Sequence, residues 1–406
     1  MRRIGSISSG RSKQQGVTLV ELMIALILGL FVLVGLSAVF IASKQAFRFQ
    51  DTAGRLQEDA SFALDTMSRD LRMAGYAGCR GVDAATVGGV TTYYPTLAMT
   101  AGAPGGIDGP NPLATVESAN AMVTFQPLSP VNFLRGFDNV PSTMFASGSA
   151  PTSSSTHSLF FSGGSSNAVS VSTAMAAVDS PIAIASDAYS WGSTKVFKMV
   201  VSDCTTSSLF AGQLNAAGTQ IVHDTVLGDT TKGQNSATSF PATPKYGVDA
   251  IVMPLEWNFY YVATRSGAAT PSLYRVFYDG SSRQDAQELI SNVESMRLNY
   301  GENLNGVDSA TNLACVISTG GAICVPTMQA DVWRTTAATV TDWSKVVAVR
   351  IGLMMVSDDN TANRDVATAV PPLLGASYSL PAGASTTRLR KEFSTTVVLR
   401  NRVAPR

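Results

Sequence analysis

A single carboxylate, Glu21, lies just inside a long apolar run of this 406-residue chain. No charged residue follows it from 22 to 43. Placing a carboxylate in lipid costs about 2.5–3.5 kcal/mol at the centre of a membrane helix, and less near the interface. Two interpretations follow. The side chain of Glu21 reaches the headgroups, or it pairs with a cation of another subunit, such as a free α-amino group. Pairing of that kind would fix the axial register of neighbouring chains.

The two histidines, His157 and His223, show no pattern typical of catalysis or of a metal site. His157 lies among Ser and Thr and is expected to be solvated. His223 precedes Asp224, but adjacent residues of a strand point to opposite faces. Nucleophile elbows, phosphate-binding loops and dinucleotide fingerprints are missing from the sequence, so we expect neither an enzyme nor a bound cofactor.

Two polar stretches allow weaker predictions of a ligand-binding site. Residues 357–365 are rich in oxygen ligands and could hold Ca²⁺, but they lack the spacing of an EF-hand, which favours a solvated loop. The C-terminal end is basic and could contact DNA phosphates. Charges on an exposed edge strand, which block pairing between sheets, explain the same pattern better. The basic residues concerned are Arg388, Arg390, Lys391, Arg400, Arg402 and Arg406.

The elements that position Glu21 begin with a basic leader. Residues 1–16 carry four basic residues and no acidic one, although the whole chain has 29 of each and no net charge. Balanced charge with 45% apolar residues excludes a disordered chain and offers no field for nucleic acid. Residues 22–43 would span about 33 Å as a helix, which is enough to cross a bilayer. Basic residues before this segment predict a cytoplasmic N-terminus and an exported body.

The helix is expected to continue beyond the membrane, from Val17 to Ala74. Apolar residues recur at steps of three and four, which indicates an amphipathic helix with one buried stripe. Gly75 and Gly78 supply its end. The stripe consists of Phe49, Ala53, Leu56, Ala60, Ala63, Met67, Leu71 and Ala74, whereas charged residues including Asp65, Arg69 and Asp70 occupy the other face.

The basic leader, Gly16 and the run Val17-Thr18-Leu19-Val20-Glu21-Leu22-Met23 resemble the prepilin signature of the type IV filament superfamily. The resemblance implies cleavage by a prepilin peptidase between Gly16 and Val17, methylation of the Val17 amine, and an assembly role for Glu21. Val17 stands where most major pilins carry Phe, which weakens the match to a major subunit.

Downstream segments narrow the resemblance to PilW-like minor pilins and, more distantly, to J-type minor pseudopilins of type II secretion. These segments are 64–76, 273–275, 288–296 and 393–402. The pilin fold that this implies is α+β: one long N-terminal helix packed on a β-rich head. We therefore divide the chain into a cleaved leader, 1–16, a helix, 17–78, and an exported head, 79–406, with an insertion at about 81–245.

Alternating apolar and polar residues predict the strands of the head independently. The clearest runs are 258–263, 273–278, 345–356 and 392–401, with 158–161 and 195–200 inside the insertion. Residues 286–296 are expected to form a short helix or turn before a strand at 297–300.

Four cysteines, Cys79, Cys204, Cys315 and Cys324, lie on the exported side, and an even number there predicts two disulfides. Three connectivities are possible. In one of them Cys315–Cys324 closes a local loop and Cys79–Cys204 ties the end of the helix to the insertion. A zinc site is the alternative, but C-x-x-C pairs are missing.

The sequence thus predicts a minor pilin that takes part in starting type IV pilus assembly and stays in the tip complex. The expected partners are other minor pilins, the major pilin, a tip adhesin, the prepilin peptidase and the inner-membrane assembly platform, with no nucleic acid. The expected location is the inner membrane before assembly and the pilus tip afterwards. Alternatives are a minor pseudopilin of type II secretion, and an adhesive or ligand-binding module in residues 81–245.

Overall fold

The computed structural model describes most of the helix and head. The described residues are 16–79, 83–87, 90–94, 96–97, 133–140, 156–224, 235, 246–265, 267–282, 284–303, 313–318, 321–326, 330–357, 370–381 and 384–402. The chain divides into two compact units, residues 1–54 and residues 55–406. The fold class is α+β, with one long N-terminal helix followed by a strand-rich domain.

Helix α1 runs from Leu19 to Arg72, slightly shorter at both ends than the sequence predicts. Thr18 caps it: the Glu21 N–H donates to Thr18 Oγ1 at 3.3 Å, so Thr18 lies outside the helix. After Arg72 the chain turns through Gly75, whose φ of +73° is a conformation that favours glycine. The predicted end of the helix at Gly75 is therefore confirmed.

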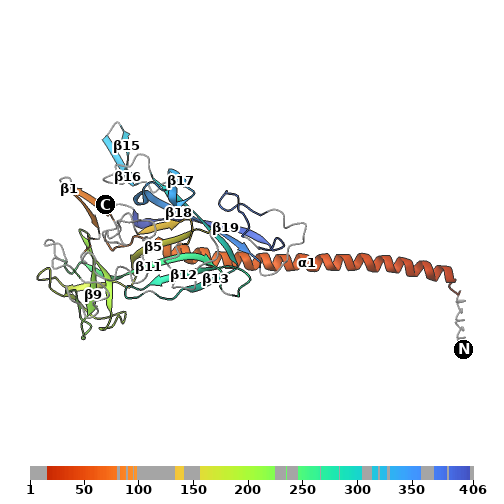
Figure 1. Cartoon of the computed structure of the whole chain (residues 1–406), viewed down its shortest axis with the longest axis horizontal. Helices are drawn as coiled ribbons and strands as arrows, with labels where there is room; N and C mark the ends of the chain where they lie inside the picture. Colours follow the sequence, from red (N-terminus) through yellow and green to blue (C-terminus); the bar gives the residue numbers. More distant parts are fainter. Residues whose placement is uncertain are drawn as a thin grey trace, which may run out of the picture. The chain divides into compact units, whose positions relative to one another are not determined.

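The larger sheet has eleven strands, and β11 (Ile251–Ala263) is its longest member. The first half of β11 pairs with β6 (Val169–Thr173) and β8 (Val196–Ser202), and its second half pairs with β5 (Ser158–Gly164) and β12 (Ser272–Tyr278). In Figure 1, β11 lies between β5 and β12. The other members are β3 (Thr96–Leu97), β4 (Leu134–Phe137), β7 (Ile182–Ile184), β9 (Ser207–Leu214), β10 (Gln220–Val222) and β13 (Gln287–Ser291).

The smaller sheet has four antiparallel strands in the order β17-β14-β18-β19. Their bounds are Val293–Glu302 for β14, Val332–Arg334 for β17, Val346–Val356 for β18 and Arg390–Val398 for β19. Two hairpins stand apart: β1 (Asp83–Val87) with β2 (Val90–Tyr94), and β15 (Leu313–Ser318) with β16 (Gly321–Pro326). Three short 3₁₀ helices complete the described elements: η2 (Ala337–Thr339), η3 (Trp343–Lys345) and η4 (Arg400–Arg402).

The main core lies where residues 55–74 meet both sheets. Buried helix residues share one apolar cluster with Leu255 and Val262 of β11, and with Met296 of β14 and Val349 of β18. A second cluster forms between β6, β7, β8, β9 and β10, around Met199 and Phe210. Strands from residues 158–222, which the sequence assigns to an insertion, are hydrogen-bonded members of the same sheet as β11.

One local prediction is wrong. Residues 286–296 form strand β13 and the start of β14 rather than a helix or turn. Asn292 separates the two strands with a φ of +66°, a left-handed conformation that asparagine tolerates better than most residues. The change of direction therefore takes a single residue, and the apolar residues on either side of it remain in extended chain.

Candidate assembly interface and the residues that position it

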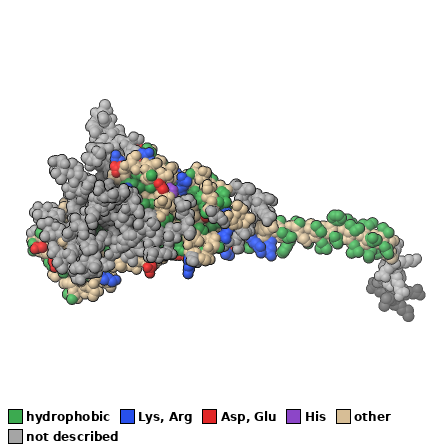
Figure 2. All heavy atoms as spheres, viewed as in Figure 1, with side chains coloured by type: hydrophobic (Ala, Val, Ile, Leu, Met, Phe, Trp, Pro, Cys, Tyr) green, Lys and Arg blue, Asp and Glu red, His purple; other side chains and the backbone are tan. Residues whose placement is uncertain are grey.

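The N-terminal part of α1 presents an apolar surface on all sides. All residues from 16 to 51 are exposed, and Val17, Leu19 and Phe31 each expose about two thirds or more of their surface. The helix is long and apolar enough to cross a membrane, with a mean hydropathy of 2.9 over its most apolar window. Hydrophobic side chains cover the visible face of this segment in Figure 2.

Glu21 lies in the first turn of α1, where the partial positive charge of the helix N-terminus favours a carboxylate. Its main chain is held by Thr18, but its side chain forms no ion pair with any described residue. The structure thus leaves the carboxylate and the neighbouring Gly16 and Val17 exposed.

The second part of α1 has one buried face. Leu56, Ala60, Ala63, Met67 and Leu71 are buried at the spacing that the sequence predicts. Phe49 is 41% exposed, so the prediction that the buried stripe starts there is wrong. The stripe begins at Leu56.

Asp70, which the sequence assigns to the solvent-facing side, anchors this helix to the large sheet. The Tyr260 hydroxyl of β11 donates to Asp70 Oδ2 at 2.5 Å, and Arg275 Nη2 of β12 lies 3.2 Å from the same oxygen. Burial raises the pKa of Tyr260, and the Asp70 carboxylate raises it further, so the hydroxyl stays protonated and remains a donor. Asp70 is next to the stripe residue Leu71 in sequence. Its two partners, Tyr260 and Arg275, are distant in sequence and could not be predicted from its neighbours.

The end of α1 is bound to β5 and to the C-terminal segment. Gly75 N–H donates to Ser162 O at 2.8 Å, and Gly164 N–H donates to Tyr76 O at 2.6 Å. Gly163 lies so close to the Met73 carbonyl oxygen that a Cβ would collide with it. Asn401 Nδ2 donates to the carbonyls of Arg72 and Ala74, at 3.2 and 3.0 Å, and so satisfies acceptors that a helix end leaves open.

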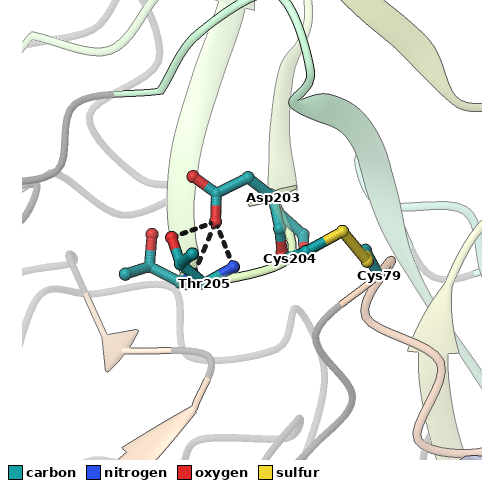
Figure 3. The surroundings of a disulfide bond; sticks show 6 residues. Cys79, Asp203, Cys204 and Thr205 are labelled. Carbon is teal, nitrogen blue, oxygen red and sulfur yellow. Dashed lines mark hydrogen bonds between the residues drawn. A yellow bond between two sulfur atoms is a disulfide. The ribbon is translucent and has the colours of Figure 1, made fainter. Parts of the chain in front are cut away.

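A disulfide joins Cys79 to Cys204, with Cα atoms 4.8 Å apart and a sequence separation of 125. Asp203 shapes the turn beside it by accepting from Thr205 N–H at 2.7 Å and from the Thr205 hydroxyl at 2.7 Å (Figure 3). The bridge therefore fastens the chain just after α1 to the loop between β8 and β9.

The register of the β15–β16 hairpin places Cys315 directly opposite Cys324. This is a geometry that cross-strand disulfides require of the backbone. The side chains of both residues lie outside the described set, so this second disulfide stays a prediction. The zinc alternative has no support in the described residues, where no group of three or more His, Cys, Asp or Glu side chains could hold a metal.

The predictions for the two polar stretches have different outcomes. Residues 358–365 of the Ca²⁺-loop alternative lie outside the described residues. Arg390 is not an exposed edge charge: its guanidinium forms two hydrogen bonds with the Glu294 carboxylate, at 2.7 and 2.8 Å, and both side chains are buried. The strand that carries Arg390, β19, pairs with β18 alone among the described strands.

The prediction that His157 is solvated is wrong. Its side chain is buried, and Nδ1 accepts a hydrogen bond from Leu298 N–H at 3.2 Å. His223 is buried as well, with Nε2 2.8 Å from the Ser180 carbonyl, so Nε2 carries the proton. Burial lowers the pKa of both rings.

Comparisons with known proteins match both ends of the chain. The prokaryotic N-terminal methylation motif matches residues 11–37, which contain Gly16, Val17 and Glu21. The family described as type IV pilus-assembly protein W matches residues 259–401, from β11 to the C-terminal 3₁₀ helix. These two matches support a PilW-like type IV pilin.

The PilW-like segment contains the C-terminal end of β11 and all of the four-stranded sheet. It also contains Tyr260 of β11 and Arg275 of β12, which hold Asp70. Among solved structures, a type IV-like pilin from Thermus thermophilus is similar at 14% identity and a TM-score of 0.18, covering 51% of this chain and 86% of that one. None of the curated proteins matches the chain. The methylation motif and the apolar helix together indicate membrane anchoring through the N-terminal part of α1.

Proposed function

We propose that this PilW-like chain is a minor pilin that takes part in initiating type IV pilus assembly and sits in the tip complex with other minor pilins and an adhesin. The observation that carries the proposal is the coincidence of two features. A prepilin methylation motif covers residues 11–37, and the helix that it begins has an apolar surface exposed on all sides. A surface of that kind requires lipid or neighbouring helices.

Processing by the prepilin peptidase would cut between Gly16 and Val17 and leave a methylated amine on Val17. The removed leader holds all four basic residues of segment 1–16. The processed chain therefore starts with an amine, followed by apolar residues and Glu21. Both Gly16 and Val17 are exposed, which suits a site that a peptidase must reach.

Assembly would move residues 22–43 from lipid to the helical core of the filament. The exchange changes polarity little, because lipid-facing helix surface becomes helix-facing surface. Glu21 would pair with the N-terminal amine of a neighbouring pilin at the assembly platform. Desolvation strengthens that pairing relative to a charge pair in water, so one correct register is selected.

The head would contribute contacts with other subunits rather than catalysis. Its large sheet holds the end of α1 through Asp70 and through β5, as described above. The region from 158 to 222 adds a separate apolar cluster at some distance in sequence from the PilW-like segment. Because that cluster gives the region a core of its own, a second proposed function is an adhesive module displayed at the tip.

The experiment is an in-frame deletion of the gene, followed by measurement of the major pilin sheared from cells. We expect surface pili to be lost while the major pilin remains in the membrane. Normal piliation would contradict an initiating role. In that case loss of adhesion would support the adhesive module, and retention of exoproteins would support a minor pseudopilin of type II secretion.

The variant Glu21→Gln tests the assembly site itself, with Glu58→Gln as the matched control on an exposed position of the same helix. Glu21→Gln should still insert into the membrane but fall at least tenfold in sheared filaments. The control should be incorporated normally. Equal amounts of the two variants in filaments would contradict the role of Glu21.

A further inference from the structure

His157 joins the two sheets of the head. The residue immediately precedes β5 of the large sheet, and it forms two hydrogen bonds to β14 of the small sheet. Its backbone N–H donates to Met296 O at 2.9 Å, and its Nδ1 accepts from Leu298 N–H at 3.2 Å. These two bonds flank Arg297 of β14.

The arrangement copies one rung of a parallel sheet, with a ring nitrogen in place of a carbonyl oxygen. In a parallel pairing one residue donates to the strand residue before its partner and accepts from the residue after it. Here Met296 and Leu298 are those two residues. The difference is that a carbonyl oxygen does not titrate near neutral pH, whereas an imidazole nitrogen does.

We propose that His157 is an acid-sensitive latch between the two sheets: protonation of Nδ1 removes the acceptor of Leu298 N–H and separates the start of β5 from β14. A protonated Nδ1 is a donor and faces another donor, so the bond and the proton exclude each other. The ring is buried, which makes a positive charge there costly.

The charged groups around the His157 ring help to set how readily it is protonated. Asp138, which follows β4, favours a proton on His157, whereas Arg297 of β14 opposes it. The other charges on these strands have partners of their own. Arg135 lies over the Trp343 ring, Glu294 pairs with Arg390, and Glu302 pairs with Arg334.

The latch connects to the anchoring of α1 through β5. The far end of β5 holds the end of the helix by the hydrogen bonds Gly75 N–H to Ser162 O and Gly164 N–H to Tyr76 O. Opening at His157 therefore loosens the strand that fixes the last turn of α1. This goes beyond an assembly role, because it makes the rigidity of the head depend on the pH outside the cell.

The sign follows from the direction of the shift. The pKa of His157 in the folded chain lies below the value of 6.5 for a free side chain. Stability from the latch is then complete above about pH 6.5 and falls as the pH drops toward the folded pKa, because the unfolded chain binds the proton first. The chain has only two histidines, so His223 is the natural control.

The experiment is hydrogen–deuterium exchange of the full-length chain in detergent at pH 7.5, 6.5 and 5.5, with labelling times scaled to the intrinsic exchange rate. The peptide containing 293–300 reports on the latch. We expect its protection to fall with acidification, by up to about tenfold per pH unit between the free value of 6.5 and the lower pKa of the ring in the folded chain. His157→Asn, which retains an oxygen acceptor that does not titrate, should remove this pH dependence, and His223→Gln should retain it.

Arg297→Gln supplies a second test that leaves His157 in place. Removing that positive charge should raise the folded pKa of His157 toward 6.5, so the total loss of protection on acidification should be smaller than in the wild type. The proposal is overturned if the wild-type peptide shows no pH dependence, if His157→Asn responds as the wild type does, or if Arg297→Gln loses as much protection on acidification as the wild type.

Discussion

Two stretches of the same helix, 19–54 and 55–72, have different relations to the rest of the chain. The first exposes large apolar residues on all its sides, whereas the second buries a single stripe from Leu56 to Leu71. Both are regular helix, so the difference lies in what covers them. The second stretch has its partner within the chain. The apolar surface of the first requires a partner from outside it, in lipid or in a filament.

The two acidic residues Glu21 and Asp70 repeat the comparison at the level of single charges. Asp70 receives the Tyr260 hydroxyl and the Arg275 guanidinium from its own head. Glu21 has no such partner among the described residues. A carboxylate with its partners built in stabilises the subunit, whereas one without them is suited to join subunits.

The largest expected effect concerns the disulfide that fastens the chain after the second stretch. Replacing Cys79 and Cys204 by Ser should lower the free energy of unfolding of the head by about 2–5 kcal/mol, because the bridge closes a long loop. Denaturant unfolding of the full-length chain in detergent measures it. The matched control replaces Cys315 and Cys324 by Ser and should cost less, since the bridge predicted between them would close a much shorter loop. Equal losses of unfolding free energy in the two double variants would contradict a special role for the Cys79–Cys204 disulfide.

A pair of leucines tests the comparison directly. Leu71→Ala removes a fully buried side chain of the second stretch and should cost about 2–5 kcal/mol of head stability. Leu33→Ala makes the same change in the first stretch, where the side chain is exposed, and should leave unfolding of the head unchanged. If Leu33→Ala destabilised the head as much as Leu71→Ala, the separation of the two stretches would be wrong.

Two carboxylates of the second stretch have different expected contributions. Asp70→Asn should cost about 1.5–3 kcal/mol, because it removes the charge from hydrogen bonds with Tyr260 and Arg275. Asp65→Asn breaks an exposed pair with Arg69 one turn away and should cost no more than about 0.5 kcal/mol. Thermal unfolding of both variants at the same pH and salt would compare them. A larger cost for Asp65→Asn would exclude Asp70 as the anchor.

The sequence predicts the parts of this fold that local patterns govern. The spacing of Leu56, Ala60, Ala63 and Met67 fixes the buried face of the helix, and Gly75 marks its end. Alternation predicts the central strands, including β11 and β18. Each of these features follows from residues a few positions apart, where helix and strand periodicity differ clearly.

The parts that the sequence does not predict depend on contacts between distant residues. The Ser and Thr neighbours of His157 predict a solvated side chain. The residue is buried because β14, which lies 139 or more positions away in sequence, packs against it. Arg390 has the pattern of an edge charge until Glu294 is placed beside it. Residues 286–296 have helix-like spacing, and the left-handed conformation of Asn292 turns them into two strands. The candidate site at Gly16, Val17 and Glu21 can be proposed from the sequence because its residues lie within one short motif.

The smallest expected effect defines the outer face of the second stretch. Phe62 is 56% exposed, on the side of α1 away from the buried stripe. Phe62→Ala should therefore change the free energy of unfolding by no more than about 0.5 kcal/mol, as substitutions at exposed positions usually do. Met67→Ala is the matched comparison, since Met67 is fully buried and its loss should cost about 2–5 kcal/mol. Urea unfolding of both variants would place the boundary of the buried stripe.

A cost for Phe62→Ala near that of Met67→Ala would mean that the head covers more than one face of the helix. The second stretch would then no longer differ from an ordinary buried helix, and the contrast with the first stretch would be one of full burial against full exposure.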